Sequence, residues 1–111
     1  MITRYAIFSG EVVTGKETEM RAFVDEKLTP LWRKFASAEE VRVLFGIEQD
    51  KNGPTIPLML AITYADTAAM EAGLASPARY ESKALLAEYY DQFFSRVELF
   101  HYVMDRACFN D

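Results

Sequence analysis

The distribution of apolar and polar positions along the chain predicts four β-strands. Between the second and third of them, residues 50–54 contain Asn52-Gly53, a pair that readily supplies the positive φ values of a hairpin loop. We therefore expect these two strands to form a hairpin around that turn. The four segments either alternate apolar with polar residues or are rich in β-branched and aromatic residues: 2–9, 41–48, 57–64 and 96–104.

Residues 17–35 carry apolar side chains at helical spacing, which predicts a first amphipathic helix. Pro30 lies inside this pattern. Because proline has no N–H group, the helix is expected to kink or restart there, and Thr29 can cap the second piece.

Helix start signals recur in the second half of the chain. Asp66 or Thr67 can cap a short helix that ends at Leu74. Ser76-Pro77 then begins a longer helix that extends to about residue 94. The element order is β-α-β-β-α-β, which predicts a ferredoxin-like α+β fold with a four-stranded antiparallel sheet and its helices on one face. We expect residues 1–111 to form a single domain.

Both faces of the predicted sheet are rich in apolar side chains. To the helix side we assign Tyr5, Ile7, Val41, Val43, Phe45, Ile47, Leu58, Leu60, Ile62, Tyr64, Val97, Leu99, His101 and Val103. The opposite side then carries Ala6, Phe8, Leu44, Met59, Ala61, Phe100, Tyr102 and Met104, mixed with Arg4, Arg42, Glu48 and Glu98. An exposed face of that composition is an unusually large apolar patch for a monomer. We therefore expect a two-fold homodimer that packs sheet against sheet.

Composition and charge exclude several classes of protein. The chain of 111 residues is 50% apolar and 14% aromatic, which is far from the composition of disordered proteins. Its net charge of −5 argues against nucleic-acid binding. No apolar run approaches the roughly 20 residues that span a membrane, and the start has no pattern of a signal peptide, so we expect a cytoplasmic protein. Cys108 is the single cysteine, and no metal-ligand spacing or nucleotide-binding motif is present, so no metal or cofactor is expected.

His101 is the only histidine and the main candidate for chemistry. A neutral imidazole in a partly apolar pocket can act as a base near pH 7. If Tyr5 and Tyr64 lie on the same sheet face, they offer two hydroxyl groups beside it, which suits a phenol, a quinol or an enolisable carbonyl. The alternative is that the histidine and both tyrosines only pack in the core.

The element order, the length and the two-sided apolar sheet resemble the dimeric α+β barrel superfamily. That superfamily includes EthD-like proteins, antibiotic-biosynthesis-type monooxygenases, small polyketide cyclases and stress-responsive barrel proteins. Leu28-Thr29-Pro30-Leu31 is similar to the H-x-P-L pattern of EthD-like members, but Leu28 stands where the pattern has histidine, so that residue's role is not carried over. Residues 74–79 are similar to the same branch. The resemblance implies a dimer through the sheet face and a pocket in each subunit between sheet and helices.

Within that fold, we expect a small, largely apolar aromatic or polyketide-like ligand. The favoured function is a cofactor-independent monooxygenase or a cyclase, with His101 as base and Tyr5 or Tyr64 orienting a substrate oxygen. The alternative is a non-catalytic ligand-binding or stress-response barrel protein; a haem-degrading barrel would have only His101 as an axial ligand. The expected substrate-binding residues are Trp32, Leu28, Phe45, Ile62, Leu86 and Tyr89.

Overall fold

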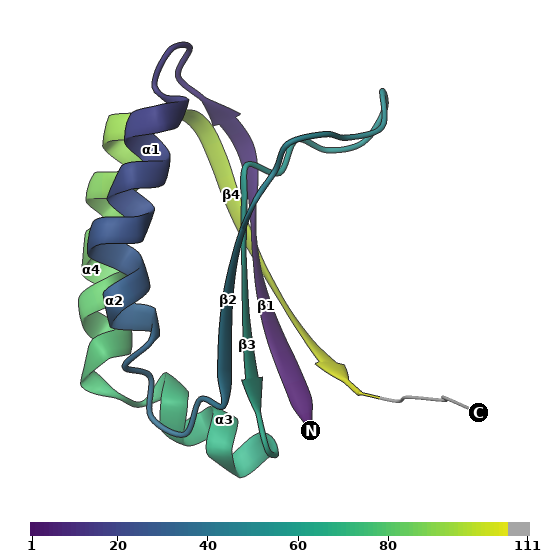
Figure 1. Ribbon diagram of the computed structural model, residues 1–111, viewed down its shortest axis with the longest axis vertical. Coiled ribbons are helices and arrows are strands. Elements are labelled where there is room, and N and C mark those ends of the chain that lie inside the picture. Colours follow the sequence, from purple (N-terminus) through teal and green to yellow (C-terminus); the bar gives the residue numbers. More distant parts are fainter. Residues whose placement is uncertain (107–111) are drawn as a thin grey trace.

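A four-stranded antiparallel sheet forms one layer of the molecule (Figure 1). The computed structural model describes residues 1–106, so Cys108 lies outside the described residues. The strand order is β2-β3-β1-β4, so β1 pairs with both β3 and β4. The strands are β1 (Ile2–Val12), β2 (Glu40–Phe45), β3 (Leu58–Tyr64) and β4 (Phe94–Asp105). This confirms the four predicted strands and the antiparallel sheet.

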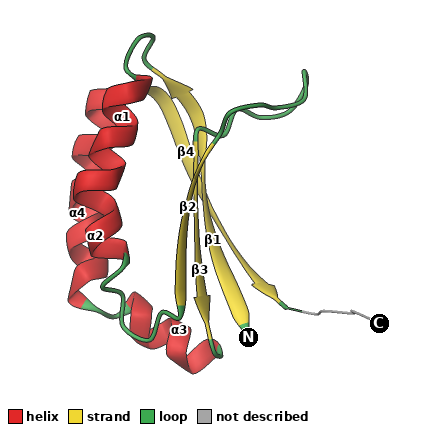
Figure 2. Ribbon diagram, viewed as in Figure 1, coloured by secondary structure: helices red, strands yellow, loops and turns green. Residues whose placement is uncertain are grey.

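The helices cover one face of this sheet and leave the other face open (Figure 2). They are α1 (Glu17–Phe23), the π-helical turn η1 (Val24–Leu28), α2 (Thr29–Trp32), α3 (Thr67–Leu74) and α4 (Pro77–Phe93). Asp66 caps α3, because its Oδ1 accepts a hydrogen bond of 2.8 Å from the backbone N–H of Ala69. The β-α-β-β-α-β order is confirmed. None of the helices in residues 1–106 is both long and apolar enough to cross a membrane.

The helix that contains Pro30 does not restart at a Thr29 cap, which corrects that part of the sequence prediction. Instead it widens into η1, where the backbone N–H of Thr29 bonds to the carbonyl of Val24, five residues earlier. A π-helical turn just before Pro30 removes the need for a hydrogen bond that proline is unable to donate. The Thr29 hydroxyl is buried and has no partner among the described residues.

The connection between β2 and β3 is an arm that projects from the sheet, not a tight hairpin (Figure 1). A turn is present at the predicted place, since the N–H of Gly53 donates to the carbonyl of Asp50 at 2.9 Å, but Asn52 and Gly53 do not have the positive φ values expected of them. However, β2 ends at Phe45. Gly46 follows, and a Cβ there would lie only 2.1 Å from the carbonyl oxygen of Ile56. Ile47 was expected on the helix side of the sheet. Because β2 ends before it, Ile47 lies on the arm instead and is 88% exposed.

The side chains of β1 face the opposite way from the sequence prediction. Ala6 lies opposite Leu60 of β3 and His101 of β4. Because paired residues of antiparallel strands share a face, the even-numbered side chains of β1, such as Phe8, point to the helices. Tyr5 then points to the face without helices, which we call the open face. Both alternating sets of β1 contain apolar residues, so only the pairing register decides between them.

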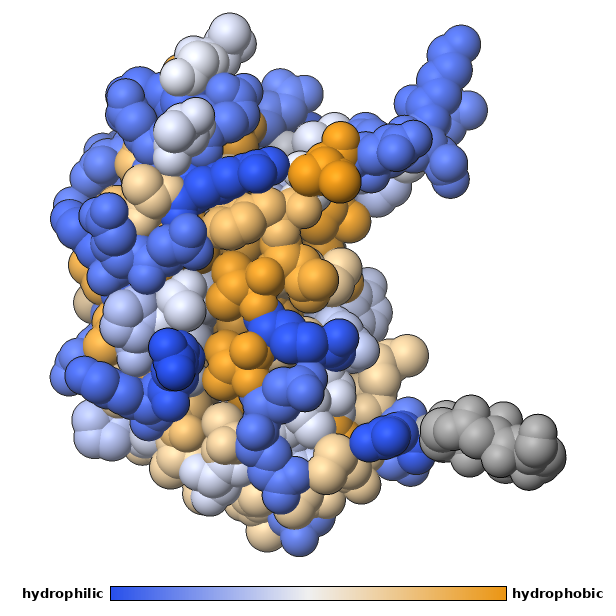
Figure 3. All heavy atoms as spheres, viewed as in Figure 1, coloured by the Kyte–Doolittle hydropathy of each residue, from blue (hydrophilic) through white to orange (hydrophobic). Residues whose placement is uncertain are grey.

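The apolar core lies between the helices and the sheet, with Tyr89 of α4 at its centre. Tyr89 has no exposed surface, and five aromatic rings lie within 6.3 Å of its ring centroid: Phe8, Phe23, Tyr90, Phe93 and Phe94. The open face also carries large apolar side chains, which are 43–56% exposed: Leu44, Phe100, Tyr102 and Met104. Figure 3 shows apolar atoms gathered in the middle of the molecule, between a largely hydrophilic helix layer and the projecting arm.

Candidate functional site

A cavity of about 400 Å³ lies between the helix layer and the sheet, and we call it the helix-side cavity. Its volume falls within the range of about 300–1,000 Å³ that is typical of small-ligand pockets. From the sheet it is lined by Arg4, Ala6, Phe8, Leu60, Leu99 and His101, and from the helix layer by Trp32, Phe35, Arg79, Ser82, Lys83, Leu86, Ala87 and Tyr90.

The long helix α4 provides one wall of this cavity through a single stripe of side chains. Arg79, Lys83, Leu86 and Tyr90 are spaced by four, three and four residues, so they lie along one face of the helix. The hydroxyl of Ser82 lies in the same stripe but donates to the carbonyl of Arg79 at 2.8 Å. The wall is therefore polar at the start of α4 and apolar toward its end.

The far end of the helix-side cavity is lined by aromatic rings. Phe8 and Tyr90 lie there, with ring centroids 6.3 Å apart. The Tyr90 hydroxyl is buried and has no hydrogen-bond partner among the described residues, and burial raises its pKa to about 12. It is therefore a protonated donor at neutral pH. Trp32 completes the wall and is 2% exposed.

The near end of the helix-side cavity is cationic. His101 is exposed at its mouth, and its pKa is lowered to about 4, first by partial burial and then by the charges of Arg4, Arg79 and Lys83. Burial and the charge of Arg79 also lower the pKa of Arg4. In residues 1–106, the ion pairs are Arg42–Glu40, Arg96–Glu11 and Arg96–Glu98, so none of these three cations forms an ion pair.

A histidine with a pKa of about 4 is neutral at pH 7 but is a weak base. An anionic oxygen beside it would raise that pKa, because an opposite charge favours the protonated imidazolium. The base strength of His101 therefore depends on what occupies the cavity.

Comparison with known proteins gives a match by structure only. No family model and no curated protein matches the sequence. An EthD family protein from Bacillus halodurans is 14% identical with a TM-score of 0.70, and the match covers 96% of this chain and 99% of that one. SnoaB, a cofactor-independent oxygenase from Streptomyces nogalater, is 17% identical with a TM-score of 0.60, covering 97% and 94%. A dimeric protein of unknown function with a ferredoxin-like fold from Bacteroides fragilis is 12% identical with a TM-score of 0.59, covering 91% and 94%.

The chain has the ferredoxin-like α+β fold. The expected fold class is confirmed. The resemblance to EthD-like proteins and to antibiotic-biosynthesis-type monooxygenases is confirmed at the level of the fold.

The ferredoxin-like sheet brings together only some of the residues that the sequence singled out. Trp32, Leu86 and His101 line the helix-side cavity. The expectation that Tyr5 shares a sheet face with Tyr64 and His101 is wrong, because the register of β1 directs Tyr5 to the open face. The other expected site residues are not among those that line the cavity: Tyr64, Tyr89, Leu28 and Ile62 are buried in the core, and Phe45 is partly buried 5.0 Å from the guanidinium of Arg21.

The cavity residues that were not among the expected site residues include Arg4, Arg79, Lys83 and Tyr90. The helical spacing of the last three residues was available as a signal. However, their stripe shares Ser82 and Leu86 with the more apolar stripe of Ser82, Leu85, Leu86, Tyr89 and Phe93, which is typical of a core-facing helix. Arg4 was missed because its strand was assigned the wrong face. Arginine lines such an inner surface readily, since its long stem packs on apolar groups while its charge stays near water.

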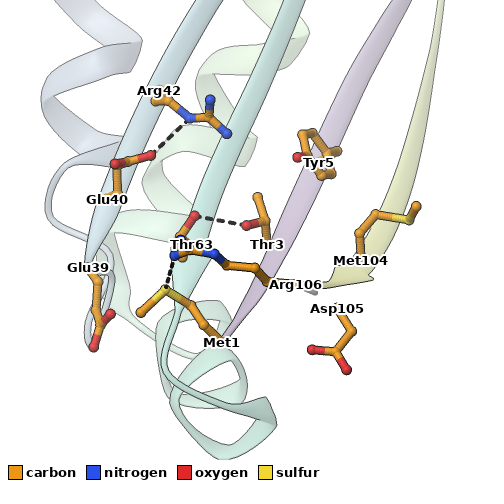
Figure 4. A pocket seen from close by; sticks show the side chains of 10 residues that line it. All are labelled: Met1, Thr3, Tyr5, Glu39, Glu40, Arg42, Thr63, Met104, Asp105 and Arg106. Carbon is orange, nitrogen blue, oxygen red and sulfur yellow. Dashed lines mark hydrogen bonds and ion pairs between the residues drawn. The ribbon is translucent and has the colours of Figure 1, made fainter. Parts of the chain in front are cut away.

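A second concavity, of about 460 Å³, lies on the open face (Figure 4). Its polar groups are partly satisfied within it: Arg42 pairs with Glu40 at 2.9 Å, and the hydroxyls of Thr3 and Thr63 lie 2.9 Å apart. Tyr5 lies here. Among the described residues, no group of three His, Cys, Asp or Glu side chains is close enough to hold a metal ion.

Proposed function

We propose that the chain binds a small aromatic or polyketide-like molecule in the helix-side cavity and acts on it as a cofactor-independent oxygenase or a cyclase. The observation that carries this proposal is the cavity of about 400 Å³, which has aromatic walls and a histidine at its mouth. The fold adds support, because SnoaB, with the same fold, is a cofactor-independent oxygenase.

Both reactions begin with the same chemical step. A proton leaves a phenol, or a carbon next to a carbonyl group, and the electrons that remain form an oxyanion. In an oxygenase without a cofactor, that electron-rich anion itself reduces O₂; in a cyclase it attacks a second carbonyl. His101 takes the proton, and the developing negative charge beside it raises its pKa and is stabilised by the neighbouring cations.

Anthrone provides a probe of this chemistry, because its methylene protons are acidic and its oxidation by O₂ gives anthraquinone and water. We expect the protein to accelerate both exchange of these protons for deuterium and consumption of O₂, or the exchange alone if it is a cyclase. His101→Ala should lose the acceleration while keeping its melting temperature. Gln92→Ala is the control, because Gln92 is an exposed side chain of α4 that does not line the cavity.

The second candidate is a protein that binds the same kind of ligand without turning it over. The low pKa of His101 favours this candidate, since it makes the free histidine a weak base. Calorimetric binding of anthrone, with methylene exchange no faster than in buffer, would establish the binding function and overturn the catalytic one.

The working form in this proposal is a homodimer joined through the open face. Leu44, Phe100 and Met104 are 43–56% exposed there, and exposed apolar side chains gathered on one face are typical of an interaction surface. The arm between β2 and β3 and the end of β4 both extend from the sheet away from the helices, so they flank the surface that a second copy would cover (Figure 1). The B. fragilis protein with this fold is dimeric.

A further inference from the structure

Three cations gather at one end of the helix-side cavity although the chain as a whole is acidic. The sequence has seventeen acidic and twelve basic residues, yet Arg4, Arg79 and Lys83 all act on His101, and no ion pair in residues 1–106 involves any of them. Like charges held together repel one another, and a cleft lined by one sign of charge concentrates the opposite ion. This end of the cavity is built to receive negative charge.

The other end of the cavity offers a different kind of contact. Tyr90 is eleven residues after Arg79 on α4, which corresponds to about 16 Å along the helix axis. Its hydroxyl is buried away from the cavity, so Tyr90 lines this end with its aromatic ring. Between the two ends, Trp32, Phe8 and Leu86 line the cavity with apolar surface. The cavity therefore suits a flat apolar body with a negatively charged group at one end.

We infer that the ligand of the helix-side cavity binds as an anion. Its carboxylate lies among Arg4, Arg79 and Lys83, and its ring lies against Trp32. This inference rests on the proposed function and narrows its ligand class from apolar to amphipathic and acidic. Neutral His101 adds a hydrogen bond at the same end. Bidentate arginine contacts are the stronger part of this recognition, because the planar guanidinium matches two oxygen atoms.

Two matched probes separate charge from shape: 2-naphthoate and 2-naphthylmethanol have the same ring system but only the first is an anion. Titration calorimetry of the intact protein at pH 7 should show the carboxylate bound at least about tenfold more tightly than the alcohol, as expected for a charge-assisted hydrogen bond. Lys83→Gln and Arg79→Gln should each reduce this preference several-fold, because the affinity for the carboxylate falls more than the affinity for the alcohol. Lys34→Gln removes the same charge from an exposed position outside the cavity and should change neither.

Three other outcomes of the titrations would contradict either the anionic ligand or the proposed function. Equal affinities for the two probes would overturn the anion inference while supporting the cavity as a site for aromatic molecules. Binding of neither probe, with the protein folded, would contradict the proposed function itself. Inorganic phosphate that competes as well as naphthoate would show that the apolar end contributes nothing, and the amphipathic ligand class would be wrong. Arg79→Gln removes the hydrogen bond from the Arg79 side chain to the carbonyl of Leu74, so this variant could be less stable. Lys83 is exposed, so Lys83→Gln should fold normally and tests the inference by itself.

Discussion

Replacing Phe100 by Glu is expected to convert the proposed open-face dimer into monomers. Phe100 lies on β4 opposite Ile7, so its side chain points from the open face. In a two-fold interface each substitution occurs twice, and a carboxylate without a partner is costly to bury. We expect the dimer dissociation constant to rise at least about hundredfold, which corresponds to roughly 3 kcal/mol.

Sedimentation velocity at micromolar concentration measures this change directly. Tyr80→Glu is the matched control, because Tyr80 is also an exposed aromatic residue but belongs to α4. The control should remain dimeric, and Phe100→Glu should keep the secondary structure of the wild type. A wild-type protein that sediments as a monomer, or a Phe100→Glu variant that still dimerises as tightly, would contradict an interface through the open face.

The largest loss of stability is expected from Tyr89→Ala. The ring of Tyr89 stacks on Phe23 at 5.6 Å and meets Phe94 edge-on at 5.1 Å, with no exposed surface. Truncating a buried aromatic side chain removes its contacts and leaves a void, which costs about 3–5 kcal/mol. The free energy of unfolding in urea should fall by that amount at equal protein concentration, since dimerisation would add to stability.

Tyr89→Phe separates the contribution of the hydroxyl group to stability from that of the aromatic ring. The Tyr89 hydroxyl is buried without a hydrogen-bond partner among the described residues, and burial raises its pKa. Because an unpaired buried hydroxyl has lost its bonds to water and gained none, removing it should leave the protein at least as stable as the wild type. If Tyr89→Phe lost as much stability as Tyr89→Ala, the hydroxyl would have a structural partner, and the packing account of this residue would be wrong.

Sequence patterns predicted the elements of this fold but not every side-chain direction. The order of strands and helices follows from local signals, such as the Asp66 cap and the Ser76-Pro77 start, which depend on neighbouring residues alone. The face that Tyr5 occupies depends instead on the register with β3 and β4. Because β1 is apolar on both alternating sets, no local signal in the strand specifies that register.

The same limit explains why the chemistry of the cavity was only partly predictable. His101 and Trp32 were identified by their residue types and both line the cavity. The cationic end contains Arg4 of β1 and Arg79 of α4. These residues are far apart in the sequence, and only the packing of α4 on the sheet places them at the same end of the cavity. A cluster formed in this way has no sequence motif, and only the folded structure brings its members together.

The helix-side cavity is the proposed ligand site, and Trp32 and His101, which both line it, allow a direct test. Trp32 and His101 are the only tryptophan and the only histidine of the chain, so each gives a single side-chain signal in an NMR spectrum. On titration with 2-naphthoate, the indole N–H of Trp32 and the ring protons of His101 should shift together and saturate with one dissociation constant. If naphthoate binds while both signals stay fixed and the backbone amides of Ala61 and Tyr102 shift instead, the ligand occupies the open face and the claim is wrong.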